Sequence, residues 1–294
     1  MSLYINPMLS NRDYGIVRVG GPGLANCMFF VARAAILAKK LNAKLMRPTW
    51  ERIGIGQWIR KERDKRFYSG LFSKKERISD MRKAILLAIS KKIKEEDAKP
   101  SMNGVVLVSG LRGYFSDLWE NRDYVCAYFQ EKILPAAIQL VPTELSNTVA
   151  VHVRLGDYPQ KWRTDINWYV KVIQKVRVFW SLMTDADATQ SLKFKVFSDG
   201  SNAELSELLA IPGVERADYG NAFADMMAIS KCKLLIGSDS TFSGWGAFLG
   251  NVPCVFSHLH YGRPLEDENL VLITEKIENY SEWLQNVLNK TPQS

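Results

Sequence analysis

The second half of the chain alternates short apolar runs with longer amphipathic segments. Each apolar run ends in Gly, Ser or Asp, and a stretch with apolar positions three or four residues apart follows it. This alternation predicts parallel strands in a sheet whose two faces are covered by helices. We expect strands within residues 149–158, 194–200, 234–237 and 252–257, and helices within residues 166–183, 202–210, 223–232, 241–250 and 277–290.

The first half shows a similar but less regular pattern. A short apolar run at residues 15–19 is followed by a glycine-rich turn at residues 20–24, and an alanine-rich segment then predicts a helix to about residue 41. Strand, glycine-rich turn and helix are the opening of a βαβ unit. Further strands are expected within residues 41–48 and 104–110, and an aromatic loop follows the second of them.

A polar, proline-containing stretch at Val141–Thr148 separates the two halves. The chain of 294 residues is long enough for two domains. We therefore expect α/β domains at residues 1–146 and 147–294, each with a parallel sheet. Ligands of such folds bind outside the carboxyl ends of the strands, so we expect a ligand in a cleft between the two halves.

Positive charge is concentrated in one segment of the first half. Arg60–Lys99 holds 14 Lys and Arg against 7 Asp and Glu, in a chain whose net charge is +8. Apolar residues recur in it at helical spacing, namely Ile78, Met81, Ile85, Ile89 and Ile93. This helical insertion either packs its apolar face on its own domain or contacts an anionic membrane or a lipid-phosphate-linked substrate. Nucleic acid is not expected as a partner, because no recognition motif accompanies the lysines.

Composition excludes several classes of protein. With 47% hydrophobic residues the chain is not disordered, and no apolar run approaches the ~18 residues of a membrane span. The N-terminal residues lack a secretory signal, so we expect a cytoplasmic protein, at the inner face of the membrane if the basic segment binds lipid. The 4 cysteines lie far apart and the 3 histidines show no zinc-ligand spacing, so neither disulfides nor a metal ion is expected.

Polar residues gather where three strands of the second half are expected to end. The first group, HVRLGDY, holds His152, Arg154 and Asp157, and its arginine has the planar fork that suits phosphate. The second group is FSDG with Asp199, and the third is SDSTFSGWGA, where a strand meets a helix N-terminus. Structural roles are the alternative: an Arg–Asp pair bracing a turn, an Asx turn or a hydroxyl helix cap. Asp225 is likewise either a cap or a hydrogen-bond acceptor.

Three anion-binding strand ends in one domain indicate a bound diphosphate. The chain has no GxxxxGK[ST] motif and its glycine-rich turn is not GxGxxG, so P-loop enzymes and dinucleotide oxidoreductases are disfavoured. No DxD pair of carboxylates adjoins these groups to hold Mg²⁺. A nucleoside-diphosphate sugar, held by an arginine and a helix N-terminus without cofactor or metal ion, fits these residues best.

The same residues resemble the motifs of glycosyltransferase family 11, the α-1,2-fucosyltransferases. HVRLGDY is similar to the family's H-x-R-R-G-D motif, and GLANCMFFVA (Gly23–Ala32) is similar to its G-L-G-N-Q-M-F motif. Further segments match in order along nearly the whole chain: Gly113–Phe115 with Trp119, Ile166–Ile173, Phe197–Asp199 and Asp225–Leu249. The ordered set is more specific than any single match.

The resemblance implies a GT-B-like fold of two Rossmann-like domains and an inverting, metal-independent fucosyltransferase. Fucose would pass from GDP-fucose to a glycan hydroxyl, with α-1,2 linkage to a galactose-type residue. The hydroxyl attacks the anomeric carbon as GDP leaves, and Arg154 would stabilise the leaving diphosphate. Asp157 is the first candidate for the general base and His152 the second.

The resemblance also assigns residues to the two substrates. In the second domain Arg154 would contact the diphosphate beside His152, and Asp225 would lie near the guanine or the ribose. Other residues would line the phosphate and the sugar, namely Asp199, Ser240, Thr241, Phe242 and Ser243. On the acceptor side, Gly23 and Asn26 would face the glycan.

The sequence departs from the family pattern at several positions. Leu155 replaces the second arginine of the motif, Cys27 stands in place of glutamine, and Gly244 stands in place of a tryptophan. Two alternatives therefore stay open. One is a transferase that uses a different nucleotide sugar, and the other is a non-catalytic protein that binds anionic surfaces through Arg60–Lys99.

Overall fold

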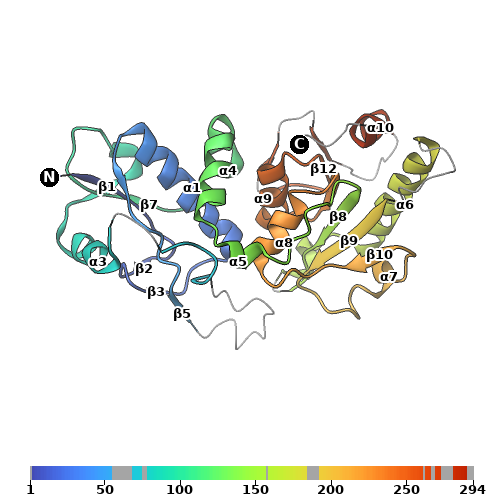
Figure 1. Cartoon of the computed structure of the whole chain (residues 1–294), viewed down its shortest axis with the longest axis horizontal. Helices are drawn as coiled ribbons and strands as arrows, with labels where there is room; N and C mark the ends of the chain where they lie inside the picture. Colours follow the sequence, from blue (N-terminus) through green and yellow to red (C-terminus); the bar gives the residue numbers. More distant parts are fainter. Residues whose placement is uncertain are drawn as a thin grey trace. The chain divides into compact units, whose positions relative to one another are not determined.

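The computed structural model describes residues 2–54, 68–74, 78–156, 158–183, 192–260, 262–265, 269–272 and 281–289. It divides into two compact units, Met1–Gln139 (unit 1) and Leu140–Ser294 (unit 2). The sequence pattern had placed the division at residues 146/147, a few residues further along. Each unit contains a parallel sheet with helices, so the predicted α/β class is confirmed (Figure 1).

The main sheet of unit 1 has four parallel strands in the order β4-β1-β7-β6. In that order the strands are Lys44–Leu45, Leu3–Pro7, Gly104–Val108 and Lys92–Lys94. Helix α1 (Leu24–Lys40) packs Ala34 and Ala38 on Leu3 and Ile5 of β1. The strand that precedes α1 in this sheet is therefore β1, and our prediction that residues 15–19 supply it was wrong.

A second, three-stranded sheet holds the end of that predicted strand. Its order is β2-β3-β5, with β2 at Arg12–Asp13, β3 at Arg18–Val19 and β5 at Arg52–Ile53. Polar contacts hold the segment around Arg18. The buried Arg18 guanidinium donates to the carbonyl oxygens of Gly20 at 2.6 Å and Thr49 at 3.0 Å.

The remaining elements of unit 1 are helical. Helix α3 spans Asp80–Ile89 and is capped by Ser79, whose hydroxyl accepts from the Arg82 N–H. The expected aromatic loop forms two 3-10 turns that lead into a longer helix. In chain order, the helical elements that follow α3 in unit 1 are η1 (Glu95–Asp97), η2 (Tyr114–Asp117), η3 (Trp119–Asn121), α4 (Arg122–Lys132) and α5 (Pro135–Ile138).

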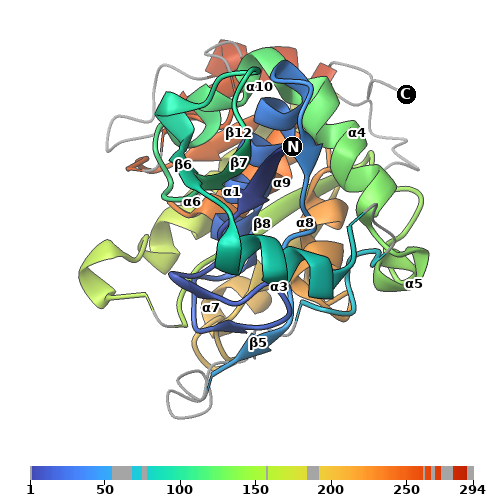
Figure 2. The ribbon, with the colours of Figure 1, turned by 90° about the vertical axis from the view of Figure 1, so that its left-hand side faces the viewer.

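Helix α3 turns apolar side chains outward. Met81, Ile85 and Ile89 are 63%, 51% and 77% exposed, whereas Lys83 on the opposite face is buried. The Lys83 ammonium donates to the carbonyl oxygen of Arg47, at 2.6 Å, and burial lowers its pKa to about 8. α3 lies beside the three-stranded sheet (Figure 2).

The predicted helical stripe is therefore split. Ile78 is buried ahead of α3, and Ile93 is buried in strand β6 and not in a helix. The interpretation in which the whole stripe packs on its own domain is wrong for its centre. Residues 60–67 and 75–77 of the predicted insertion lie outside the described residues.

Unit 2 is built on six parallel strands in the order β10-β9-β8-β11-β12-β13. The four central strands match the prediction: β9 (Lys193–Ser198), β8 (Thr148–Val153), β11 (Leu234–Gly237) and β12 (Cys254–Phe256). The edge strands β10 (Val214–Arg216) and β13 (Leu270–Leu272) were not predicted.

Helices of unit 2 follow the predicted order. They are η4 (Gln160–Trp162), α6 (Ile166–Met183), α7 (Ser206–Leu209), α8 (Ala222–Ile229), α9 (Thr241–Gly250) and α10 (Ser281–Asn289). Only four residues of the helix expected at 202–210 are α-helical. Across the described residues of both units, no helix is long and apolar enough to cross a membrane.

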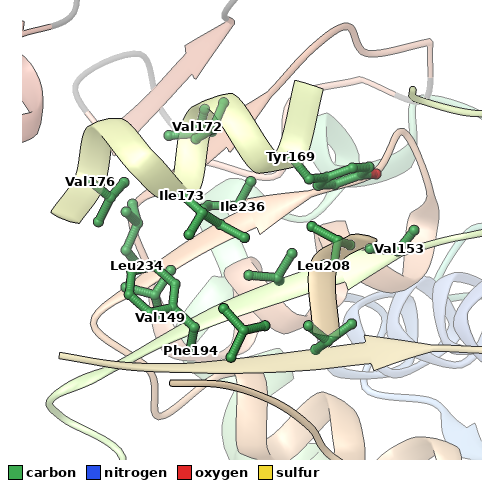
Figure 3. Packing of buried hydrophobic residues seen from close by; sticks show 14 of the residues in the cluster. Val149, Val153, Tyr169, Val172, Ile173, Val176, Phe194, Leu208, Leu234 and Ile236 are labelled. Carbon is green, nitrogen blue, oxygen red and sulfur yellow. The ribbon is translucent and has the colours of Figure 1, made fainter. Parts of the chain in front are cut away.

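Strand β8 supplies side chains to two cores, one on each face of the sheet. Val149, Val151 and Val153 pack in the core that includes α6 and α10, whereas Ala150 packs with residues of α8 and α9. Figure 3 shows side chains of α6 lying over Val149 and Phe194. Both faces are covered, so polar residues gather where the strands end.

Candidate functional site

Three neighbouring strands of unit 2 bring the predicted polar groups together at one edge of the sheet. β9, β8 and β11 are adjacent and parallel, so their carboxyl ends lie side by side. The Ser238 hydroxyl joins two of these ends. It accepts a hydrogen bond from the Arg154 N–H at 2.9 Å and donates one to the His152 carbonyl oxygen at 2.7 Å. The sequence analysis placed Ser238 in the third polar group but did not predict this contact.

Arg154 is held in place by Asp199 from the end of β9. The Arg154 Nη1 forms an ion pair with Asp199 Oδ2, and Asp199 Oδ1 accepts the Leu155 N–H at 2.8 Å. The side chains of Arg154 and Asp199 are 30% and 20% exposed. A Cβ at Gly156 would overlap the Asp199 carboxylate, so this turn needs a glycine. The result is a positioned guanidinium that solvent can still reach.

His152 lies beneath this surface and is buried. Its Nδ1 lies 2.6 Å from the Ser243 hydroxyl oxygen, and its ring stacks on Phe242 with centroids 4.8 Å apart. Burial lowers the pKa of His152 to about 3; the Asp199 carboxylate opposes this shift, and the Arg154 cation adds to it. The imidazole is therefore neutral near pH 7, and its contacts hold the first turn of α9 against the end of β8.

The N-terminus of α9 completes the group. Ser240 caps the helix, because its hydroxyl accepts the N–H groups of Phe242 at 3.2 Å and Ser243 at 3.3 Å. Thr241 is the first residue of the helix. The start of a helix carries a partial positive charge that favours anions. With the Arg154 guanidinium on the neighbouring strand end, this edge of the sheet has the donor groups that a phosphate requires.

The small residues of α9 serve helix packing. A Cβ at Gly246 would overlap Ile229 of α8, and one at Gly250 would overlap the Ser230 backbone. Close packing of α8 on α9 therefore explains this part of the motif without a ligand.

Another predicted residue of unit 2, Asp225, belongs to helix α8. Asp225 lies in the first turn of α8, where Asn221 provides the cap, and its Oδ1 accepts the Tyr219 N–H at 2.8 Å. Asp225 thus holds the turn before α8. Asp157 lies outside the described residues. The next residue, Tyr158, donates its hydroxyl to the Asp239 carbonyl oxygen at 2.9 Å.

Unit 1 has a cavity of its own at the carboxyl ends of β1 and β7, with a volume of about 500 Å³. Polar groups from Ser10, Asn11 and Arg12 line it together with apolar Val19 and Phe30. Its wall also includes Gly20–Pro22, which lead directly to Gly23, the N-cap of α1. Gly23 and Asn26 themselves are not among its described lining residues.

Two buried arginines brace the walls of this cavity. Arg33 of α1 donates to the carbonyl oxygens of Ser109, at 2.8 Å, and Gly110, at 2.6 Å, and pairs with Glu95. Arg18 donates to the carbonyl oxygen of Gly20, another lining residue. Sequence analysis missed both arginines, although a single charged residue within the apolar run of α1 was a signal.

Comparison with known proteins shows the family. The model of glycosyl transferase family 11 matches residues 91–256, which is more than half of the chain. The chain therefore belongs to glycosyl transferase family 11, as the motifs indicated. This membership favours the enzyme over the non-catalytic, anion-binding alternative.

One curated relative and two solved structures show how far the likeness extends. An Escherichia coli protein named alpha-1,2-colitosyltransferase is 27% identical over 187 residues, which are 55% of this chain and 59% of that protein. The match thus spans about three fifths of the relative's length.

Fucosyltransferase NodZ from Bradyrhizobium aligns with a TM-score of 0.50 and 13% identity, over 86% of this chain and 94% of NodZ. Escherichia coli ADP-heptose LPS heptosyltransferase II aligns with a TM-score of 0.45 and 12% identity, over 98% of each chain. At such identity the likeness to NodZ shows the fold alone, and the predicted GT-B-like class is confirmed.

Proposed function

We propose that this glycosyltransferase transfers fucose from GDP-fucose to a hydroxyl of a glycan acceptor, with inversion and with α-1,2 linkage to a galactose-type residue. The observation that carries the proposal is the meeting of Arg154, Asp199 and the Ser240-capped N-terminus of α9 at one edge of the unit 2 sheet. These groups supply positive charge and hydrogen-bond donors where a nucleoside diphosphate would lie.

In the proposed reaction the acceptor hydroxyl attacks the anomeric carbon of the donor. The glycosidic bond to the diphosphate breaks, and GDP leaves with the electron pair of that bond. Negative charge grows on the leaving oxygen, so Arg154 and the start of α9 stabilise the transition state more than the bound donor. Asp199 acts by orienting the guanidinium. Thr241 lies at the helix start, within reach of a phosphate bound there.

The proton of the acceptor hydroxyl needs a base. Asp157, the first candidate, stays a prediction from the sequence. His152 suits a positioning role better than proton transfer, because its pKa of about 3 disfavours the imidazolium form and its Nδ1 contacts Ser243. We therefore propose that His152 holds the first turn of α9 against the end of β8.

The acceptor glycan is proposed to bind unit 1. Its cavity of about 500 Å³ combines polar groups with the Phe30 ring, and sugars present both hydroxyls and an apolar face. Gly23 lies next to this wall, so the acceptor role suggested for Gly23 and Asn26 is kept as part of the proposal.

A second donor is supported by the curated relative, whose name is alpha-1,2-colitosyltransferase. Nucleotide-activated colitose is therefore the alternative donor for the same site. A donor panel separates the two. Purified protein with [¹⁴C]-labelled or unlabelled nucleotide sugars and a galactose-terminated acceptor should release GDP fastest from GDP-fucose. Turnover of the colitose donor alone would replace the fucose assignment and leave the site assignment intact.

We also propose that unit 1 docks on an anionic membrane at the cytoplasmic face. Met81, Ile85 and Ile89 form one exposed stripe on α3, and the exposed Arg82 and Lys91 lie beside it. Apolar side chains flanked by cations are typical of helices that lie in the membrane interface. Two copies docked through this stripe would bring their cations together, which disfavours self-association.

A further inference from the structure

A second group of side chains in unit 2 has the chemistry of a metal site. We propose that Asp239, His258 and His260 bind one divalent transition-metal ion, with zinc as the reference ion. One ligand atom from each of the three residues lies within 4.8 Å of the other two. No other group of three such side chains was found among the described parts of the chain.

The carboxylate of this group is fixed by the fold. Asp239 follows strand β11 and is buried at 2% exposure. Its Oδ1 accepts the backbone N–H of His260 at 2.9 Å, which ties the segment after β12 to the end of β11. The other oxygen, Oδ2, contacts His260 Nδ1 and lies 3.8 Å from His258 Nε2. Both imidazoles therefore direct one nitrogen at the same carboxylate oxygen.

The His258 ring is oriented from its far side. Its Nδ1 lies 2.7 Å from the Ser257 hydroxyl oxygen, and that oxygen lies 3.1 Å from the Thr164 hydroxyl. A histidine that ligates a metal through one nitrogen is commonly held by an oxygen at the other, which fixes its tautomer and orientation. Ser257 and Thr164 provide this second contact, and Nε2 is left to face Asp239.

Two imidazoles and one carboxylate select the type of ion. Mg²⁺ and Ca²⁺ prefer all-oxygen ligands, whereas imidazole with carboxylate suits Zn²⁺, Co²⁺, Ni²⁺ or Fe²⁺. Metal–ligand bonds of about 2.0–2.2 Å require the three ligand atoms to move closer to one another than they are in this structure. His260 is 68% exposed and His258 38%, so both rings have room to move. On binding, the metal takes the place of the proton that His260 Nδ1 donates to Asp239, and the neutral ring then carries its single proton on Nε2.

Three protein ligands leave coordination positions open for water or a substrate oxygen. Asp239 directly precedes Ser240, the cap of α9. The metal site does not rest on the proposed function.

The test is a calorimetric titration of chelator-stripped, nucleotide-free protein with ZnCl₂ in a buffer free of phosphate. Binding of Co²⁺, followed by its visible absorption, is the second readout. We expect one ion per chain in the wild type. In the double variant His258→Ala/His260→Ala we expect zinc affinity to fall more than about tenfold and the Co²⁺ absorption to vanish.

The matched control is Cys126→Ser, because thiols are the other common zinc ligands and Cys126 is only partly buried. This variant should bind like the wild type. The absence of stoichiometric binding in the wild type would overturn the proposal, as would unchanged binding in the double variant with its fold confirmed by circular dichroism. Since no nucleotide is present, failure here is separate from failure of the donor assignment.

Discussion

Replacing Arg154 by glutamine tests the donor site most sharply. The substitution removes the positive charge and the planar fork but keeps a shorter, polar side chain. Arg154 is 30% exposed and its ion pair with Asp199 is only partly buried, so the pair adds at most about 1 kcal/mol to stability. The fold should therefore survive. The expected loss is in donor binding and catalysis.

The size of that loss follows from the contacts a guanidinium makes with phosphate. Two charge-assisted hydrogen bonds at about 1.5 kcal/mol each amount to about 3 kcal/mol. At about 1.4 kcal/mol per factor of ten, this is a decrease of roughly 10²-fold in kcat/KM for the donor. Arg154→Lys keeps the charge without the fork, so its activity should fall between the wild type and Arg154→Gln.

The assay is GDP release at varied donor concentration, with thermal unfolding measured in parallel. The matched control is Arg177→Gln, which makes the same change in net charge on α6, where the Arg177 guanidinium contacts the Pro212 carbonyl oxygen. Its kcat/KM should stay within about twofold of the wild type. If Arg154→Gln keeps near-wild-type activity, or if the control loses as much, the guanidinium does not act on the diphosphate.

Three further predictions concern the helix cap, the buried histidine and the exposed face of α3. Ser240→Ala removes the cap of α9 and should lower the free energy of unfolding by about 1 kcal/mol in urea titrations; no measurable change would contradict the cap assignment. His152 has a native pKa of about 3, below its unfolded value, so the unfolded state binds more protons between about pH 6.5 and 3. Stability should fall with decreasing pH in that window, by up to about 1.4 kcal/mol per unit, and His152→Asn should flatten the slope; an equal slope in the variant would refute this. Ile85→Ser/Ile89→Ser should weaken sedimentation with phosphatidylglycerol vesicles several-fold, whereas replacing Leu140, an exposed leucine of unit 2, by serine should not. Equal loss in both variants would argue against docking through α3.

Unit 2 could be predicted well because its signals are local. The central strands β8, β9, β11 and β12 are apolar runs that end in turn residues, and the strand ends carry the polar groups. The edge strands β10 and β13 have three residues each, too few for a pattern to show. The contact of His152 with Ser243 could not be foreseen, since the two residues lie on different elements that only the fold brings together.

Unit 1 was harder to predict because buried charges decide its local structure. Arg18 sits at the end of the predicted strand at residues 15–19, yet its guanidinium is buried among carbonyl oxygens, so the run belongs to a small sheet and not to the main one. Lys83 likewise finds partners at Arg47 and Thr49, far away in sequence. Because of that contact, the lysine faces the interior and Ile85 faces solvent. The spacing of apolar residues along the helix predicts the opposite arrangement.

The metal-site proposal shows a related limit of spacing rules. His258 and His260 stand two residues apart, but their third partner, Asp239, belongs to the preceding strand end and lies close only because β11 and β12 are neighbours in the sheet. No spacing along the chain predicts such a set.

The most direct test of the central claim is a calorimetric titration of the wild type and Arg154→Gln with GDP-fucose, GDP-mannose and UDP-glucose, all in the presence of EDTA. The account predicts that the wild type binds GDP-fucose in preference to the other two, and that Arg154→Gln binds it roughly 10²-fold more weakly. Absence of binding to every nucleotide sugar, or equal affinity in the variant, would contradict the assignment of the unit 2 strand ends as the donor site.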